Sequence, residues 1–250
     1  MNILQSTFNT YSGISMKRIL TILSVLVLLS TQCLFSRTYV LCVGVSNYGD
    51  PNVNLTQSSK DAKAFSELMK NKSRDVSLLT SSYANHDNIL ATLRKIADRT
   101  QEDDVIVFFY SGHGSNNMIY TYNGPVYYSE IVNILASARS KHKICFIDAC
   151  LSGTVSSVLT SGGRMKYDDI CFLVSSRADE YSMEHPLVGA GFLSQSLLKG
   201  IRGKADADKN RKVTMLELFK YAAYDVAKRS NDSQHPQFYG SSKMQSVVVY

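Results

Sequence analysis

The chain of 250 residues carries a formal net charge of +6, with 44% hydrophobic and 19% charged residues. This length suits one sizeable α/β domain, and the ordinary composition excludes the fibrous and intrinsically disordered classes. Its basic residues are spread without a basic run, which speaks against a nucleic-acid-binding surface.

The first 36 residues differ from the rest and are predicted to be a secretory signal peptide. Lys17 and Arg18 precede an apolar run at 19–29, and a short polar stretch follows at 30–36. This order is typical of an export signal, and the run is too short for a permanent membrane anchor. Because residues 1–15 carry no positive charge, we expect translation to begin at Met16. The mature chain, 37–250, is expected in the periplasm, at the cell surface or outside the cell, without a membrane span.

The cysteines have two interpretations. Acylation of Cys33 would anchor the chain to a membrane, but Gln32 before it is larger than the residue that such sites prefer, so we favour export without a lipid. Cys42, Cys145 and Cys171 lie within apolar runs, as buried thiols do, and the spacing shows no CxxC pair. The sequence therefore predicts neither a disulfide framework nor a zinc site.

Apolar runs alternate with amphipathic segments along the mature chain. The runs predicted to be strands are 37–46, 76–79, 105–110, 144–147, 170–174 and 246–250. The segments predicted to be helices are 58–70, 85–99, 129–138, 191–201 and 214–228. Ser129 and Thr214 are expected N-caps, the latter in a capping box with Glu217. A hairpin is expected near 120–124 and an exposed linker at about 154–169. This alternation predicts one α/β domain, with a mostly parallel sheet covered by helices on both faces.

Two predicted strands end next to a reactive side chain. Ser-Gly-His-Gly, with His113, follows the run at 105–110, and Asp-Ala-Cys-Leu-Ser-Gly, with Cys150, follows the run at 144–147. Open α/β sheets place active sites at the carboxyl ends of their strands. A thiol beside an imidazole makes a nucleophile and its acid/base, and the N–H groups of Gly114 and Cys150 are the expected oxyanion donors. Alone, each residue would suggest a loop histidine or a half-buried thiol; together they indicate an enzyme.

The motifs at 110–114 and 148–153 resemble the histidine and cysteine motifs of the caspase-like cysteine peptidases, most closely the metacaspase and bacterial branch. The order of the remaining segments is also similar to that family. The resemblance implies a caspase-haemoglobinase fold, with a six-stranded, mostly parallel sheet and helices on both faces. It also implies an endopeptidase acting on polypeptides, with Cys150 as the nucleophile and His113 as the acid/base.

The resemblance suggests where substrate specificity lies. Metacaspase-like enzymes cut after Arg or Lys and need carboxylates in the pocket, whereas caspases proper cut after Asp and use arginines. Asp61 and Asp148 match acidic positions of the first group, and Ser175 is expected to line the same S1 pocket. In the simpler interpretation, Asp61 stabilises a helix N-terminus and Asp148 accepts local N–H groups. Arg177 would suit an acidic substrate instead, but we favour cleavage after Arg or Lys.

Many metacaspases use calcium, yet no acidic residue follows the histidine motif up to residue 128. Asp206, Asp208, Asn210 and Glu217 have the spacing of a calcium loop, but its sixth position is Arg211 in place of Gly. The capping box already accounts for Glu217. We therefore expect no metal and no cofactor, with calcium at this loop as the alternative.

Arg164 and Lys166, in the expected linker, are candidate self-cleavage points, because an enzyme that cuts after basic residues would cut its own exposed loop. Three other functions stay open: an inactive caspase-like binding module of the cell envelope, a peptidase that cuts after Asp, and another thiol hydrolase on a related sheet. The oligomeric state is also open, including whether an edge strand near Val247 pairs two chains.

Overall fold

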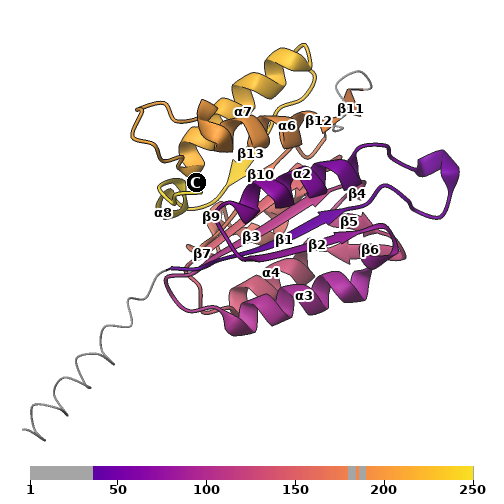
Figure 1. The fold of residues 1–250 in the computed structure, drawn as a ribbon, viewed down its shortest axis with the longest axis horizontal. Helices are drawn as coiled ribbons and strands as arrows, with labels where there is room; N and C mark the ends of the chain where they lie inside the picture. The colour runs from indigo at the N-terminus through magenta and orange to yellow at the C-terminus, as the bar shows by residue number, and fades with distance from the viewer. Residues whose placement is uncertain (1–35, 180–183, 186–189, 250) are drawn as a thin grey trace, which may run out of the picture. The chain divides into compact units, whose positions relative to one another are not determined.

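A six-stranded sheet forms the centre of the fold (Figure 1). The computed structural model describes residues 36–179, 184, 185 and 190–249. The strand order is β13-β10-β7-β3-β1-β2, and every neighbouring pair is parallel except β10 with β13. The strands are β1 (Thr38–Gly44), β2 (Asp75–Thr80), β3 (Val105–Ser111), β7 (His142–Asp148), β10 (Ile170–Val174) and β13 (Gln237–Tyr239).

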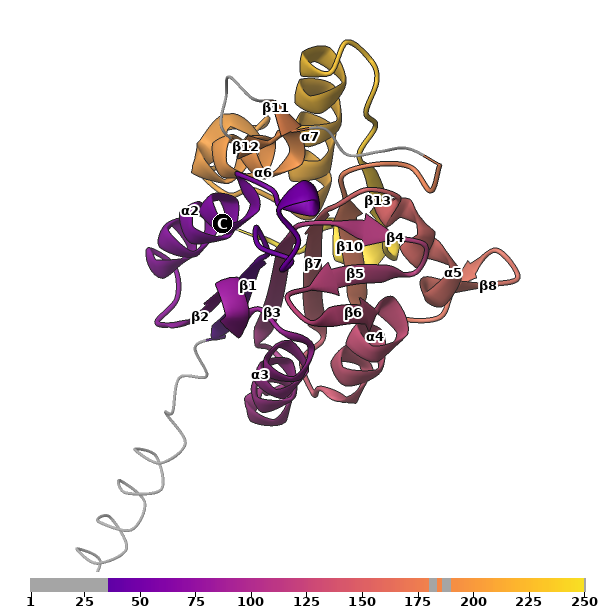
Figure 2. The same ribbon diagram turned by 90° about the vertical axis from the view of Figure 1, so that its right-hand side faces the viewer.

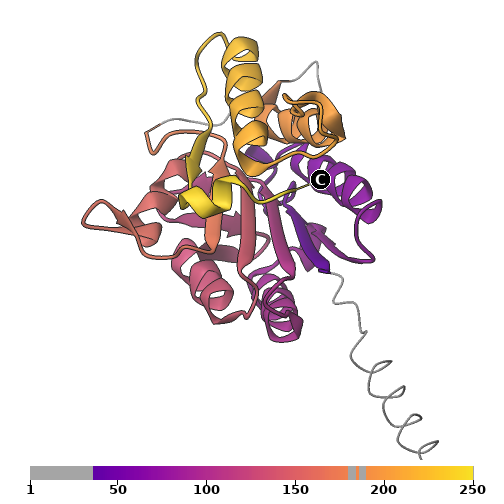
Figure 3. The ribbon, with the colours of Figure 1, turned by 90° about the vertical axis from the view of Figure 1, so that its left-hand side faces the viewer.

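Helices cover both faces of this sheet, as Figure 1 shows. One face carries α2 (Ser58–Lys70), α6 (Phe192–Lys199) and α7 (Met215–Arg229), and the other carries α3 (His86–Arg99), α4 (Tyr128–Ser137) and α5 (Ser156–Leu159). A short helix, α8 (Ser242–Gln245), lies at the end of the sheet that faces the viewer in Figure 3. Single helical turns are η1 (Pro51–Val53), η2 (Ser81–Tyr83), η3 (Ser152–Val155) and η4 (Gly200–Lys204).

Small antiparallel sheets extend the loops. They are β4 (Gly114–Ser115) with β5 (Met118–Thr121) and β6 (Gly124–Tyr127), β8 (Thr160–Ser161) with β9 (Arg164–Met165), and β11 (Glu184–His185) with β12 (Ala190–Gly191). The first of these follows β3 directly, so it lies close to the carboxyl edge of the central sheet (Figure 2).

The central strands are buried on both faces because successive side chains enter two different apolar cores. In β3, Phe108 and Tyr110 pack with α3 and α4, whereas Val107 and Phe109 pack on the side of α2. The ring of Phe109 stacks on Phe65 of α2 at a centroid distance of 4.4 Å. The continuous apolar runs of the sequence thus become central strands, and polar residues begin where the strands end.

The predicted α/β architecture is confirmed, with its mostly parallel six-stranded sheet between two layers of helices. The predicted last strand at 246–250 does not join the sheet, and within its described residues Val248 forms an isolated antiparallel bridge with Thr214. Val247 accepts the backbone N–H of Met215, and Val249 donates to the carbonyl oxygen of Val213, so this segment runs along the start of α7. The antiparallel edge strand is β13, whose three residues are too few to form a recognisable apolar run.

Two helix starts show how capping signals succeed and fail. Thr214 caps α7 through the predicted box, because its Oγ1 accepts the Glu217 N–H at 3.3 Å and the Glu217 carboxylate accepts the Thr214 N–H at 3.0 Å. The predicted N-cap at Ser129 is wrong. The N-cap of α4 is Tyr127, and its N–H donates to Glu130 Oε2 at 2.9 Å. The glutamate satisfies the N–H of Tyr127, whereas an N-cap serine at 129 would have accepted an N–H from the turn that follows it.

The segment 154–169, expected to be an exposed linker, contains regular structure: η3 and α5 in its first part and the β8–β9 hairpin after them. Val155 and Leu159 are fully buried and anchor η3 and α5 against the sheet. Gly162 and Gly163, with φ values of 55° and 75°, form the turn of the β8–β9 hairpin. The exposed side chains that a linker was expected to have are concentrated in this hairpin and in the residues directly after it, such as Lys166 and Asp168.

From Arg37 onward the chain forms one compact unit. The predicted signal peptide, including Cys33, lies outside the described residues apart from Ser36. Within the described ranges, no helix has the length and apolar character needed to cross a bilayer.

Candidate active site

Strands β3 and β7 bring the histidine and cysteine motifs together at the carboxyl edge of the sheet, seen in Figure 2. The two strands are parallel neighbours with Ser111 opposite Asp148, so the residues that follow them emerge side by side. The Gly112 N–H donates to the Asp148 carbonyl oxygen at 3.2 Å and ties the two strand ends together. His113 and Cys150, both partly exposed, follow directly.

The segment after His113 lies against the backbone of Cys150. A Cβ atom at Gly114 would lie 2.7 Å from the Cys150 carbonyl oxygen, 2.8 Å from Ala149 Cβ and 3.6 Å from the Cys150 nitrogen. Only a glycine allows this approach. The two residues whose N–H groups were predicted to stabilise an oxyanion are therefore in direct contact.

Cys150 stands at the start of a tight turn. Leu151 has φ 51° and ψ 23°, a left-handed conformation that costs energy for a residue with a side chain. The Ser175 hydroxyl accepts the Ala149 N–H at 3.0 Å and donates to the Ala149 carbonyl oxygen at 2.9 Å. Ser175, predicted to line the substrate pocket, is fully buried and in these bonds fixes the residue before Cys150.

The His113 ring is oriented by groups that the sequence did not reveal. Its Nε2 lies 2.7 Å from the Val53 carbonyl oxygen. Because a carbonyl only accepts, Nε2 carries a proton and Nδ1 is the remaining basic nitrogen. Tyr48 packs on the ring at a centroid distance of 4.7 Å, and its hydroxyl oxygen accepts the His113 backbone N–H at 2.7 Å. Both groups belong to the loop between β1 and α2, which carries no motif.

Asp61 and Asp148 converge on one place at the same edge of the sheet. Asp61 Oδ2 accepts the Gly191 N–H at 3.1 Å and the Ser111 hydroxyl at 3.2 Å. Asp148 Oδ2 accepts the Ser194 N–H at 2.9 Å and the Ser194 hydroxyl at 2.7 Å. A Cβ atom at Gly191 would clash with that same Asp148 oxygen. The two carboxyl groups, 2% and 6% exposed, therefore flank Gly191 and form a buried acidic site.

Arg177, the residue that would suit an acidic substrate, is exposed on the segment after β10. Its backbone packs on Gly153, where a Cβ atom would lie 2.7 Å from the Arg177 carbonyl carbon. The sequence did not identify Ser111 and Ser194 as the partners of the acidic site, because serines are common at strand ends and in the first turn of a helix.

The family model described as the caspase domain matches residues 37–247. The chain belongs to the caspase domain family. Two solved structures share the fold of this caspase domain. Protein GSU0716 from Geobacter sulfurreducens is 14% identical with a TM-score of 0.64, over 84% of this chain and 97% of that chain. Caspase-1 from Spodoptera frugiperda is 16% identical with a TM-score of 0.61, over 85% and 90%. No curated protein sequence matches the chain.

The thiols of this caspase domain differ in their surroundings. Cys42, Cys145 and Cys171 are fully buried in the sheet, and burial raises the pKa of each thiol well above its usual value. None of the described cysteines forms a disulfide. Among them, Cys150 is the one that is partly exposed and can present a thiolate to a substrate.

Tyr110 supports the histidine loop from within the core. Its hydroxyl lies 2.8 Å from the His113 carbonyl oxygen and 2.6 Å from the Tyr120 carbonyl oxygen. Burial, together with the neighbouring Tyr48 hydroxyl, raises the pKa of Tyr110 well above its usual value, so it stays a neutral donor. The residue thereby ties the His113 loop to strand β5.

The carboxyl groups of Asp206, Asp208 and Glu217 approach within 4.8 Å of one another before α7. Asp206 accepts the N–H groups of Asn210 and Arg211 at 3.1 and 2.9 Å, and Asp208 accepts the Asn210 N–H at 3.1 Å. The backbone of the loop thus accounts for the arrangement, and the cluster by itself does not indicate a bound cation.

Proposed function

We propose that the chain is a cysteine endopeptidase in which Cys150 and His113 hydrolyse peptide bonds after Arg or Lys. The Cys150 thiolate attacks the substrate carbonyl carbon, a C–S bond forms, and the N–H groups of Gly114 and Cys150 donate to the oxyanion. The C–N bond then breaks as His113 gives a proton to the leaving amine. Water, deprotonated by His113, hydrolyses the thioester, releases the new carboxyl group and restores the thiol.

The arrangement around His113 supports its role as the acid/base. With Nε2–H directed to the Val53 carbonyl oxygen, Nδ1 is the nitrogen that exchanges protons with the thiol and the leaving amine. Tyr48 packs on the ring and restrains its rotation, as a positioned catalytic group requires.

The observation that carries the substrate preference is the buried pair of carboxyl groups, Asp61 and Asp148, beside the dyad. A guanidinium or ammonium group is the natural partner of such a pair, through charge-assisted hydrogen bonds. The simpler interpretation, that Asp148 only accepts local N–H groups, explains its bonds to Ser194 but not the burial of a second acid next to it.

The test is to assay the purified protein on fluorogenic peptides with Arg, Lys or Asp before the scissile bond. We expect cleavage after Arg and Lys that is lost in Cys150→Ala. Asp61→Asn and Asp148→Asn should each lower kcat/KM for the Arg peptide by about 10- to 100-fold, because each removes a hydrogen bond to a charged group worth about 1.5–3 kcal/mol.

Asp98→Asn is the matched control, since Asp98 is exposed on α3 and should leave kcat/KM unchanged. Cleavage after Asp alone would contradict the acidic pocket and implicate Arg177. Absence of cleavage on every peptide would favour the inactive binding module. Repeating the assay with added calcium and with a chelator measures whether a cation contributes.

A further inference from the structure

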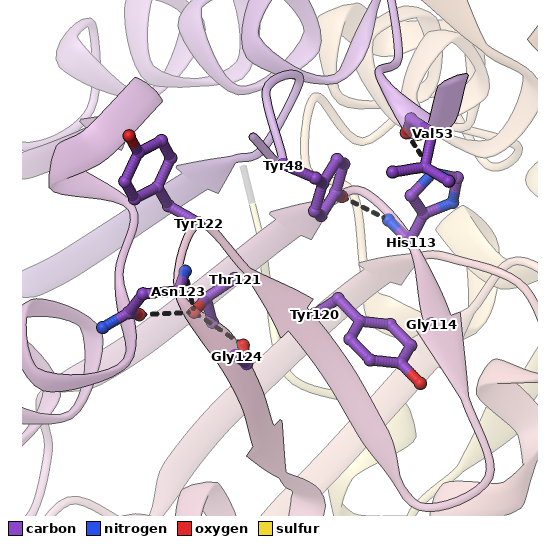
Figure 4. A pocket seen from close by; sticks show the side chains of 9 residues that line it. All are labelled: Tyr48, Val53, His113, Gly114, Tyr120, Thr121, Tyr122, Asn123 and Gly124. Atoms are coloured by element: carbon purple, nitrogen blue, oxygen red, sulfur yellow. Dashed lines mark hydrogen bonds between the residues drawn. The ribbon is translucent and has the colours of Figure 1, made fainter. Parts of the chain in front are cut away.

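A cavity of about 480 Å³ opens beside His113. Its lining includes Tyr48, Val53, His113 and Gly114, and the β5–β6 hairpin, with Tyr120 and Tyr122, forms the rest (Figure 4). The acid pair is not part of its lining. The mechanism derived above leaves this space unused, although the catalytic histidine is one of its walls.

The cavity and the acid pair lie on different faces of the sheet. In β3, the Ser111 hydroxyl points to the face of α2 and bonds Asp61. Tyr110, the neighbouring residue, points to the opposite face, and its hydroxyl bonds the carbonyl oxygen of Tyr120 in the cavity wall. His113 and Cys150 follow at the edge between the two faces. A peptide with its P1 side chain at the acid pair would therefore continue past His113 toward the cavity.

Four of the nine described residues that line the cavity are aromatic, and none of the nine is a carboxylate, a lysine or an arginine. Tyr120 and Tyr122 are 38% and 39% exposed, so much of each ring is available for contact. The volume is in the range of pockets that take a substrate group, about 300–1,000 Å³. Uncharged aromatic or large aliphatic side chains gain most from such a surface, by burial of apolar area and by ring–ring contacts.

The wall formed by the hairpin is fixed in place. The Thr121 hydroxyl donates to the Gly124 carbonyl oxygen at 2.7 Å, and Asn123 Oδ1 accepts the backbone N–H of His86 at 2.9 Å. These bonds, drawn in part in Figure 4, hold the turn between β5 and β6. A cavity with fixed walls binds a side chain without the entropic cost of ordering a loop.

We propose that this cavity binds an aromatic or large aliphatic side chain from the first two substrate residues on the leaving-group side of the scissile bond. The proposal rests on the proposed function, because His113 must stand next to the leaving nitrogen to protonate it. The residues attached to that nitrogen then follow the histidine into the cavity. The chain would thus select substrates on both sides of the cut, by a basic residue before it and an apolar residue after it.

The first experiment measures kcat/KM on internally quenched peptides with Arg before the cut and Phe or Gly at each of the two positions after it. We expect wild type to prefer Phe by about tenfold or more at one of these positions. Tyr120→Ala or Tyr122→Ala should reduce the Phe/Gly ratio below about threefold, and Tyr122→Phe should restore it. Tyr224→Ala, which alters a 69% exposed tyrosine on α7, is the control and should keep the wild-type ratio. Equal rates for Phe and Gly in wild type would overturn the proposal.

A second measurement separates this inference from the proposed function. An Arg-aminomethylcoumarin amide has no residues after the cut, so failure to cleave it counts against the peptidase and not against the cavity. Binding of the leaving-side product Phe-Phe-amide to Cys150→Ala protein, by calorimetry, does not need turnover. It should be about tenfold or more tighter than binding of Gly-Gly-amide, and Tyr122→Ala added to the same protein should remove most of the difference. Equal affinities, or a difference that survives Tyr122→Ala and Tyr120→Ala, would overturn the proposal.

Discussion

Gly114 is the residue at which a single added methyl group should have the largest effect on catalysis. Its neighbours are the backbone of Cys150 and the Ala149 methyl group, which cannot rotate away. Gly114→Ala should therefore displace an oxyanion donor and lower kcat/KM by about 100-fold or more. It should also reduce the free energy of unfolding by about 1–3 kcal/mol. Kinetics on the Arg peptide and urea denaturation measure the two effects.

The neighbouring variant Ser115→Ala is the control for this prediction, because it changes the next residue of β4 without adding an atom near Cys150. It should keep most of the activity. If Gly114→Ala stayed within about twofold of wild type, the contact between the two loops would have no role in the reaction.

Burial should also decide which thiol reacts. Cys42, Cys145 and Cys171 are inaccessible, and their raised pKa values keep them protonated at neutral pH. Brief treatment of the native protein with iodoacetamide should therefore alkylate Cys150 and leave these three unmodified, as peptide mass spectrometry can establish. After unfolding in urea all four should react, which controls for detection. Labelling of Cys145 or Cys171 in the native protein at the rate of Cys150 would contradict the burial argument.

At the scale of the elements, His86 links the start of α3 to α4. Its Nδ1 lies 2.9 Å from Asp87 and its Nε2 lies 3.3 Å from Glu130, and the bond to Asp87, followed by that to Glu130, raises the pKa of His86 above 6.5. A raised folded-state pKa stabilises the fold below about pH 6.5, and this contribution is lost as the pH rises through the folded value. Because the side chain is 35% exposed, the effect should stay below about 1 kcal/mol.

The measurement for His86 is the difference in unfolding free energy between wild type and His86→Gln at several pH values. The difference should favour wild type at pH 6 and shrink toward pH 8. Sodium chloride at 1 M should reduce the difference at pH 6, since the pair is partly solvated. A difference that grows with pH would show that the histidine does not act through its charge.

The elements differed in how far the sequence could predict them. Long runs such as 105–110 and 170–174 became central strands because burial on both faces leaves a continuous apolar signal. β13 was missed because a three-residue edge strand buries little apolar surface and is too short to show an alternating hydrophobic pattern. In α4 the choice between Tyr127 and Ser129 as N-cap depended on where the preceding hairpin delivers the chain, which is a tertiary property.

The same distinction holds for the candidate site. His113 and Cys150 were predictable because a reactive residue after a strand, flanked by small residues, has a local signature. The roles of the Val53 carbonyl and of Ser194 could not be predicted. Any residue type can supply a backbone carbonyl, and a serine in a helix can have many roles. Their contribution depends on segments that are far apart in sequence and meet only at the edge of the folded sheet.

For the whole molecule, the proposed peptidase function raises the question of whether the chain cuts itself. Arg164 in the β8–β9 hairpin and Lys166 directly after it are exposed basic residues. Two residue pairs form this hairpin, so it should open at small cost and offer the extended chain that peptidases bind. We expect purified wild-type protein to be cut slowly into two fragments, with the cut after Arg164 or Lys166. The Cys150→Ala variant should stay intact.

The double variant Arg164→Gln with Lys166→Gln should block this conversion without lowering activity on the Arg peptide. The control is Arg202→Gln with Lys204→Gln, an exposed basic pair in the helical turn η4, where the backbone is not extended; this variant should still be cut. Addition of wild type to Cys150→Ala protein should produce the same fragments, because the hairpin is accessible to a second molecule. A first-order rate that does not depend on protein concentration would instead show cleavage within one chain. Wild type that remains one band, with the mass of Cys150→Ala, would rule out self-processing.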